Sequence, residues 1–198
     1  LLDSTEQYER AQHQFAAHGI TTGDVSIDVP TMLKRKDKIV ADLTGGIGGL
    51  FKKNGIDWLQ GSARIASAGQ VEITAADGAV QTVSANAIVI ATGSTPVDIP
   101  VAVVDGQQIV DSSGALNFDQ VPRRLGIIGA GVIGLELGSV WRRLGADVTL
   151  LEAMPELLPP VDRDLARQAA RAYKKQGLQI RLGARVTGSE IGSDGVEV

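Results

Sequence analysis

The sequence predicts an α/β protein in which a doubly wound domain with a parallel sheet follows a region that contains a small antiparallel meander. Three observations predict this class. Residues 124–152 follow the order strand, glycine turn, helix and strand, which is typical of a dinucleotide-binding unit. Residues 56–83 are instead typical of short strands separated by turn residues. The change of pattern near residue 121 divides the 198 residues into a domain of residues 1–121 and an incomplete domain of residues 122–198.

Two helices are expected at the start of the chain. Residues 5–18 have helical composition, and Gly19 follows them as a residue that commonly ends helices. Pro30 is expected to open a second helix, because proline fits the first helical turn. This helix should continue to Leu50 or Asn54.

The meander is expected between the second helix and the dinucleotide unit. Short strands are expected at residues 56–59, 70–74 and 80–83. Asp77-Gly78 is the expected turn between the last two strands. The run Ala87–Ile90 is continuously apolar and predicts a buried strand. This strand would deliver Thr92, Gly93 and Ser94 to the domain surface, where their small side chains allow a ligand to approach.

Glycines occupy the turn that follows the expected strand of residues 125–128. Gly129, Gly131 and Gly134 form the G-x-G-x-x-G spacing where strand becomes helix. Gly129 permits a tight turn, Gly131 lets the backbone approach a diphosphate, and Gly134 lets helix and sheet pack closely. The free N–H groups and the dipole of the following helix form an anion site that needs no basic side chain.

A carboxylate closes the next expected strand, residues 146–151. Glu152 lies about 20 residues beyond the glycines, where ribose recognition requires an acid. Its charge would repel the additional phosphate of NADP, and residues 153–156 contain no arginine, so the sequence favours NAD. The alternative interpretation is a surface glutamate at a strand end beside a purely structural turn.

The rest of the chain is expected to continue the sheet. Asp162 is expected to cap a helix that runs to Lys175, and strands are expected at residues 178–182 and 185–187. Trp141 lies on the helix after the glycine turn, where a packing role is favoured over contact with a cofactor.

Composition excludes several classes of function. The net charge is −4 and the isoelectric point about 5.2, so no basic field attracts nucleic acid or an anionic membrane. No apolar run reaches the roughly 18 residues that cross a bilayer, and no signal segment opens the chain, so a cytoplasmic protein is expected. The absence of cysteine excludes thiol chemistry within these residues. His13 and His18 lack the i, i+4 spacing of a helical metal site, so the sequence assigns no metal ligand. No catalytic residue is assigned within the sequence either.

Several stretches of the sequence closely resemble the dihydrolipoamide dehydrogenase family of flavin-dependent pyridine nucleotide-disulfide oxidoreductases. They are residues 43–47 (LTGGI), 90–94 (IATGS), 111–116 (DSSGAL), 121–122 (VP) and 127–136 (IIGAGVIGLE), so the resemblance covers nearly the whole chain. The run Gly138–Trp141 favours this family over the related glutathione and mercuric reductases.

The resemblance implies two dinucleotide cofactors. NAD would bind the domain that begins near Arg124, and residues 1–121 would be the later part of an FAD-binding domain. The residues expected along FAD are Gly61, Thr92, Gly93 and Ser94. The residues expected along NAD are Gly129, Ala130, Gly131, Val132, Ile133, Gly134, Leu135, Glu136, Glu152 and Val186. Glu136 also has a structural interpretation, because a carboxylate in the first turns of a helix interacts favourably with the helix dipole.

The resemblance also implies the reaction of a parent enzyme. That enzyme would oxidise dihydrolipoamide with a cysteine pair and pass electrons through FAD to NAD, as a homodimer serving the lipoyl groups of 2-oxo acid dehydrogenase or related complexes. The cysteine pair and the acid-base His and Glu of the family would lie outside residues 1–198, so an internal fragment is expected. Three alternatives stay open, namely a nucleotide-binding fragment without turnover, a related flavin disulfide reductase, and an NADH oxidoreductase without a disulfide.

Overall fold

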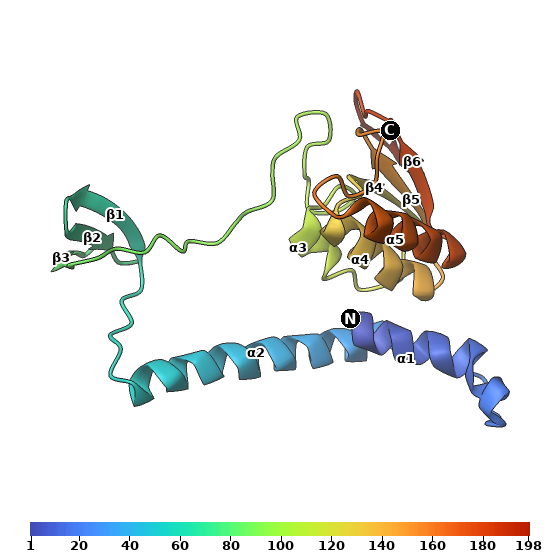
Figure 1. Ribbon diagram of the computed structural model, residues 1–198, viewed down its shortest axis with the longest axis horizontal. Coiled ribbons are helices and arrows are strands. Elements are labelled where there is room, and N and C mark those ends of the chain that lie inside the picture. Colours follow the sequence, from blue (N-terminus) through green and yellow to red (C-terminus); the bar gives the residue numbers. More distant parts are fainter. The chain divides into compact units, whose positions relative to one another are not determined.

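The computed structural model describes residues 1–198, which divide into two compact units. The large unit comprises Leu1–Asp37 and Pro96–Val198, and the small unit comprises Lys38–Thr95. Figure 1 shows the elements, which are in chain order α1 (Leu2–His13), the 3-10 helix η1 (Phe15–His18), α2 (Val29–Lys53), β1 (Ser62–Ser67), β2 (Gln70–Thr74), β3 (Val80–Ser84), α3 (Ser112–Ala115), β4 (Arg124–Ile128), α4 (Val132–Arg143), β5 (Asp147–Glu152), α5 (Arg163–Lys175), β6 (Gln179–Leu182), β7 (Glu190–Gly192) and β8 (Gly195–Glu197).

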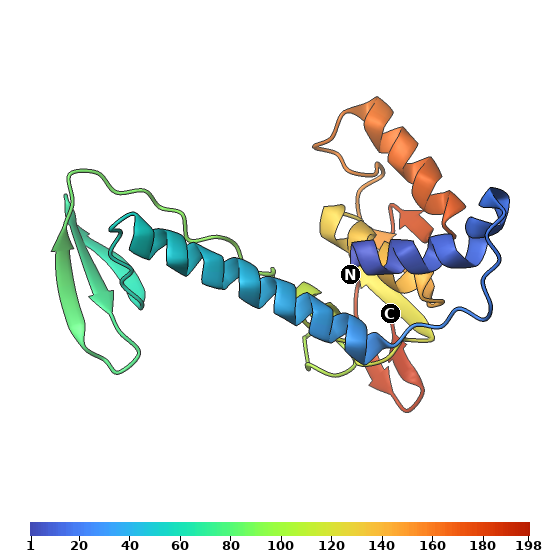
Figure 2. The ribbon, with the colours of Figure 1, turned by 90° about the horizontal axis from the view of Figure 1, so that it is seen from below.

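A parallel sheet organises the large unit. Its strand order is β4-β5-β6, with α4 connecting the first pair and α5 the second. The register places Ile127 opposite Leu150, and Leu150 opposite Ile180. α4 packs against β4 and β5, and α1 packs against α4 (Figure 2). This arrangement confirms the α/β class, because a helical crossover is the connection that parallel strands require.

The core of the large unit forms where α4 covers the sheet. Leu135, Val148 and Leu150 are fully buried, and Trp141 lies at its centre with no exposed surface. The Trp141 indole donates to the carbonyl oxygen of Ala115 at 3.1 Å, which satisfies its only polar atom. The packing role predicted for Trp141 is therefore confirmed.

The small unit contains the predicted antiparallel meander, in the order β1-β2-β3. β2 and β3 lie where the sequence predicts strands, and Gly78 adopts the positive φ of +85° that the expected turn needs. The strand predicted at residues 56–59 is wrong, since β1 begins at Ser62. The left-handed Gly69 turns the chain tightly, so the partner of β2 must be the segment directly before that turn. The apolar residues at 56–59 therefore do not indicate a strand.

Two further predicted strands are absent. Residues 87–90 form no ladder, and Val89 and Ile90 are 86% and 73% exposed. Residues 185–187 also lack a hydrogen-bonded neighbour, and the chain instead forms the hairpin of β7 and β8. Both runs have the composition of strands. A strand also needs a neighbour for its N–H and C=O groups, and composition does not reveal whether one is present.

Helix ends follow the local signals in the sequence. α1 ends at His13, and η1 extends the helical path to His18, where Gly19 closes it with a left-handed φ of +73°. Asp162 caps α5 by accepting hydrogen bonds from the N–H groups of Asp164 and Leu165, as predicted. None of these helices has both the length and the apolar character that crossing a membrane would require.

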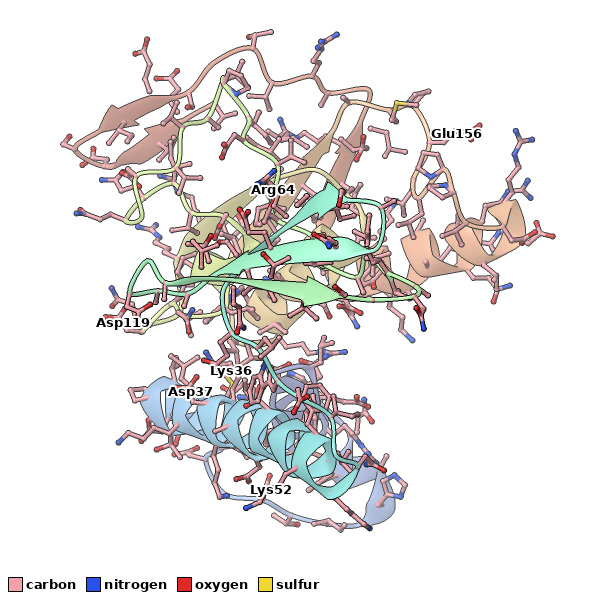
Figure 3. All side chains as sticks on the ribbon, turned by 90° about the vertical axis from the view of Figure 1, so that its left-hand side faces the viewer. Lys36, Asp37, Lys52, Arg64, Asp119 and Glu156 are labelled. Carbon is pink, nitrogen blue, oxygen red and sulfur yellow. The ribbon has the colours of Figure 1, made fainter.

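Charged side chains tie the beginning of α2 to the large unit. The Lys36 ammonium donates to the carbonyl oxygen of Leu116 and to Oδ1 of Asn117, and it pairs with Asp37 at 3.0 Å. Lys36 and Asp37 are labelled on this helix in Figure 3. In the small unit, Arg64 and Glu72 pair across β1 and β2 at 2.9 Å.

Candidate dinucleotide-binding site

The glycine turn after β4 has the backbone geometry that its sequence predicts. Gly129 has a φ of +99°, a conformation that side chains disfavour, and its N–H donates to the carbonyl oxygen of Leu151 at 2.8 Å. A Cβ at Gly134 would collide with the carbonyl oxygen of Gly129. The first glycine therefore permits the turn and the third permits the close approach of helix and strand.

Gly131 differs from these two glycines. It is the N-cap of α4 with extended backbone, and a Cβ placed on it would meet no atom within 4 Å. The protein itself therefore gives no steric reason for a glycine here. The following residues Val132 and Ile133 are 56% and 60% exposed. This leaves the positive end of the α4 dipole open to an anion.

Glu152 lies at the carboxyl end of β5 and faces the glycine turn. Its Oε2 accepts a hydrogen bond from the N–H of Ala130 at 2.8 Å, and its Oε1 accepts one from the N–H of Met154 at 2.8 Å. The carboxylate is half-buried and fixed by these two bonds. Each oxygen keeps a further lone pair, so the group can still accept hydrogen bonds from two neighbouring hydroxyls.

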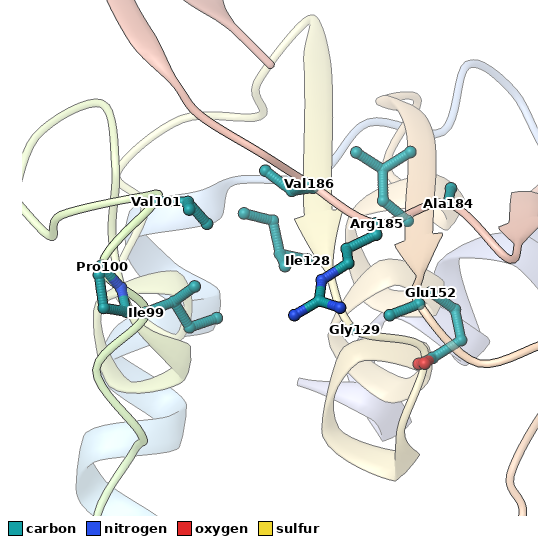
Figure 4. Close-up of a pocket in the computed structure, with 11 residues that line it drawn as sticks. Ile99, Pro100, Val101, Ile128, Gly129, Glu152, Ala184, Arg185 and Val186 are labelled. Atoms are coloured by element: carbon teal, nitrogen blue, oxygen red, sulfur yellow. The ribbon is translucent and has the colours of Figure 1, made fainter.

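A pocket of about 380 Å³ opens beside this carboxylate (Figure 4). Its walls include Gly129, Glu152 and Val186, three of the residues expected along NAD. It lies at the carboxyl ends of β4 and β5 and beside the segment that follows β6, the edge at which open α/β sheets bind ligands.

Sequence reasoning missed two parts of this pocket. Ile99, Pro100 and Val101 form an apolar wall. Arg185 extends into the pocket between Ile99 and Glu152. Its position shortly after a parallel strand was the available signal, because the carboxyl ends of neighbouring strands meet at one edge of the sheet.

The other expected NAD residues lie on α4. Leu135 is buried in the core, and its N–H donates to the carbonyl oxygen of Gly131. Glu136 is exposed. Burial raises the pKa of the Tyr173 hydroxyl on α5, and the neighbouring negative charge of Glu136 raises this pKa further. The contacts of Leu135 and Glu136 with NAD stay predictions.

The residues expected along FAD belong to the small unit. Gly61 has a φ of +155°, and a Cβ there would collide with the carbonyl oxygen of Thr74 across the β1-β2 pair. The hairpin alone therefore explains this glycine. Thr92, Gly93 and Ser94 lie on an exposed segment without regular structure, and Gly93 has a φ of +77°. The contacts of all four residues with FAD stay predictions.

Comparison with known proteins places this geometry in a family. The family profile described as pyridine nucleotide-disulphide oxidoreductase matches residues 2–198. A dihydrolipoyl dehydrogenase of Cupriavidus necator is 48% identical over 198 residues, which is all of this chain and 42% of that protein. A leghemoglobin reductase of Vigna unguiculata is 41% identical over all of this chain and 38% of its own length. The chain thus spans about two fifths of the length of the curated relatives it matches.

Solved structures agree with this assignment. LpdA from Mycobacterium tuberculosis superposes with a TM-score of 0.85 over 98% of this chain and 43% of its own, and at 23% identity this likeness shows the fold. The HOCl-induced flavoprotein disulfide reductase RclA from Escherichia coli is 28% identical, with a TM-score of 0.72 over 97% of this chain and 41% of its own.

Proposed function

Because the chain belongs to the pyridine nucleotide-disulphide oxidoreductase family, we propose that it is the NAD-binding part and a portion of the FAD-binding part of a dihydrolipoyl dehydrogenase. The family consists of flavin oxidoreductases, and the dihydrolipoyl dehydrogenases in it use FAD and NAD. In the proposed reaction, dihydrolipoamide is oxidised and its electrons pass through FAD to NAD.

The hydrogen bond between Glu152 and the N–H of Ala130 is the observation that carries the proposed NAD site. It holds the carboxylate at 2.8 Å from the glycine turn, so the groups expected to bind ribose and diphosphate belong to one rigid arrangement. A carboxylate at this place suits the two hydroxyls of an unmodified ribose. The open space above Gly131 suits a diphosphate that approaches the backbone.

In this proposal the residues of the chain bind and orient the cofactor. The N–H groups at the start of α4 would hold the diphosphate, and Glu152 would accept hydrogen bonds from the ribose hydroxyls. Val186 would contribute an apolar wall. Bound NAD and FAD supply the two-electron chemistry. The protein would contribute by holding NAD in place, because the distance between the nicotinamide and flavin rings depends on how firmly the nucleotide is held.

The remaining assignments follow from the same family. Residues 1–121 would form the later part of the FAD-binding domain, with Gly61 and residues 92–94 along FAD, and residues 122–198 would form part of the NAD-binding domain. The whole enzyme would be a cytoplasmic homodimer that serves the lipoyl groups of 2-oxo acid dehydrogenase or related complexes. Relatives named dihydrolipoyl dehydrogenase support this assignment over other flavin disulfide reductases.

A second candidate function is nucleotide binding without turnover by residues 1–198 alone. The specific observation that favours it is the absence of cysteine, because a disulfide oxidoreductase needs thiols to react with its substrate. In this case the dinucleotide site would be intact while dihydrolipoamide oxidation would be absent.

Calorimetric titration of the chain with NADH, beside a dihydrolipoamide oxidation assay on the same preparation, tests the proposal. We expect NADH to bind and no dihydrolipoamide to be oxidised. Turnover by the chain would overturn the binding-only candidate. Absence of any NADH binding by folded chain, checked by circular dichroism, would overturn the proposed NAD site.

A further inference from the structure

The proposed NAD pocket contains a cation that the glycine motif does not require. Arg185 follows β6 and is the only basic residue among those that line the pocket. Its guanidinium points into the pocket, in front of the Gly129 turn (Figure 4). The surrounding side chains of Ile99, Val101 and Val186 are apolar and offer it no partner.

The carboxylate in the same pocket forms no salt bridge with this cation. Glu152 directs both oxygens to backbone N–H groups, those of Ala130 and Met154, each at 2.8 Å. Arg185 is absent from the five salt bridges of the structure. Arg185 is exposed to solvent and takes part in no salt bridge, so its guanidinium is available to an anion carried by a ligand.

We propose that Arg185 binds a phosphate group of the dinucleotide and so helps to set both affinity and cofactor preference at this site. The proposal rests on the proposed NAD site and adds to it a side chain that family motifs and glycine spacing do not supply. A guanidinium fits phosphate geometry because two parallel N–H groups can meet two phosphate oxygens. The phosphate is either the diphosphate over the glycine turn or the additional 2′-phosphate of NADP.

Contact between Arg185 and a 2′-phosphate would change the preference between NAD and NADP. Glu152 disfavours a 2′-phosphate by charge repulsion, whereas Arg185 in the same pocket attracts it. The two side chains would therefore oppose each other in the choice between NAD and NADP. The chain would then accept NADP more readily than Glu152 alone predicts.

Calorimetric titration of the 198-residue chain with adenosine, ADP and adenosine 2′,5′-bisphosphate tests the role of Arg185. The variants are Arg185→Gln, Arg185→Lys and, as the matched control, Arg181→Gln, which removes an exposed arginine on β6 outside the pocket. We expect Arg185→Gln to weaken a phosphate-bearing ligand about tenfold, while Arg185→Lys loses less and Arg181→Gln is unchanged. Adenosine affinity should not change in any variant.

The outcomes distinguish the two phosphate groups that Arg185 could bind. They also distinguish failure of this proposal from failure of the proposed NAD site. Loss of affinity for both ADP and the bisphosphate supports contact with the diphosphate, and loss for the bisphosphate alone supports contact with the 2′-phosphate. Equal affinities in wild type and Arg185→Gln, or an equal loss that includes adenosine, would overturn the proposal and leave the NAD site standing. Failure of the wild type to bind ADP would overturn the proposed NAD site and the role of Arg185 with it.

Discussion

Glu152 combines a structural role with the recognition role that we propose for it. Its two oxygens accept hydrogen bonds from Ala130 and Met154, which fixes the loops after β4 and β5 at the edge of one pocket. The structural interpretation and the functional one are therefore compatible, because a carboxylate has more acceptor positions than these two bonds use. Substitution of this residue should affect both stability and cofactor choice.

Replacing Glu152 with arginine should reverse the charge at the proposed ribose site. We expect NADH affinity to fall about tenfold and the preference for NADPH over NADH to rise, because the new cation attracts a 2′-phosphate. Fluorescence titration with both cofactors measures the ratio. Glu152→Gln is the control, since its amide oxygen can still accept from Ala130, while the charge and the bond from Met154 are lost. An unchanged ratio in Glu152→Arg would show that Glu152 does not face the ribose.

Gly131 and Gly134 offer a matched pair in the same turn. Gly134→Ala should lower the free energy of unfolding by about 2 kcal/mol or more, because its Cβ would collide with the Gly129 carbonyl. Gly131→Ala should leave stability near that of the wild type, because its Cβ would meet no protein atom within 4 Å. Thermal melts and NADH titrations of both variants check this. Gly131→Ala should lose NADH affinity with an unchanged melting temperature, and wild-type affinity would contradict a diphosphate at this glycine.

Helices were more predictable from the sequence than strands. Gly19, Pro30 and Asp162 marked helix ends that the structure confirms, since capping depends on residues next to one another in the chain. The runs 87–90 and 185–187 formed no strands, since a strand depends on a distant partner. The same reasoning explains which parts of the candidate site could be predicted from the sequence. Local spacing indicated the Gly129 turn, whereas Arg185 enters the pocket only through the folding of the sheet.

The stability of the N-terminus of α2 should depend on pH. Asp28 accepts a hydrogen bond from the N–H of Thr31 at 2.9 Å, and this bond holds the pKa of the exposed carboxyl below its usual range. A carboxyl with a lowered pKa stabilises the fold when ionised, so the contribution is present at neutral pH and lost as pH falls through the lowered value. NMR titration of the Asp28 carboxyl and the Thr31 amide measures it.

The matched control for this capping interaction is Asp28→Asn. An asparagine can accept the same hydrogen bond without titrating, so the Thr31 amide should then be insensitive to acid. A Thr31 amide that responds equally in both proteins would mean that Asp28 does not cap α2.

The two units differ in how much apolar surface they bury. The core side chains gather in the large unit around Trp141, Leu135 and Leu150, whereas Ile73 is the only buried hydrophobic side chain of the small unit. Burial of apolar surface is the main favourable contribution to folding, so the small unit should be the less stable one. Its exposed Val89 and Ile90 add apolar surface that a folded protein normally covers.

Hydrogen exchange measures this difference directly. Amides of β2 should exchange at least about 100-fold faster than amides of β5, because the small unit opens without disturbing the core of the large unit. Mass spectrometry of peptides from each strand after timed exchange resolves the two rates. Equal protection of the two strands would show that the units open together.

Mapping of NADH binding by NMR tests the central claim most directly, because it locates the ligand without requiring turnover. Titration of NADH into isotope-labelled chain should shift the amides of the glycine turn, residues 129–134, and those of Glu152 and residues 184–186, which line the pocket. The β2 and β3 amides of the small unit should stay in place. Shifts confined to other residues, or saturating binding without any change at Gly131 and Glu152, would contradict a dinucleotide site at the glycine turn.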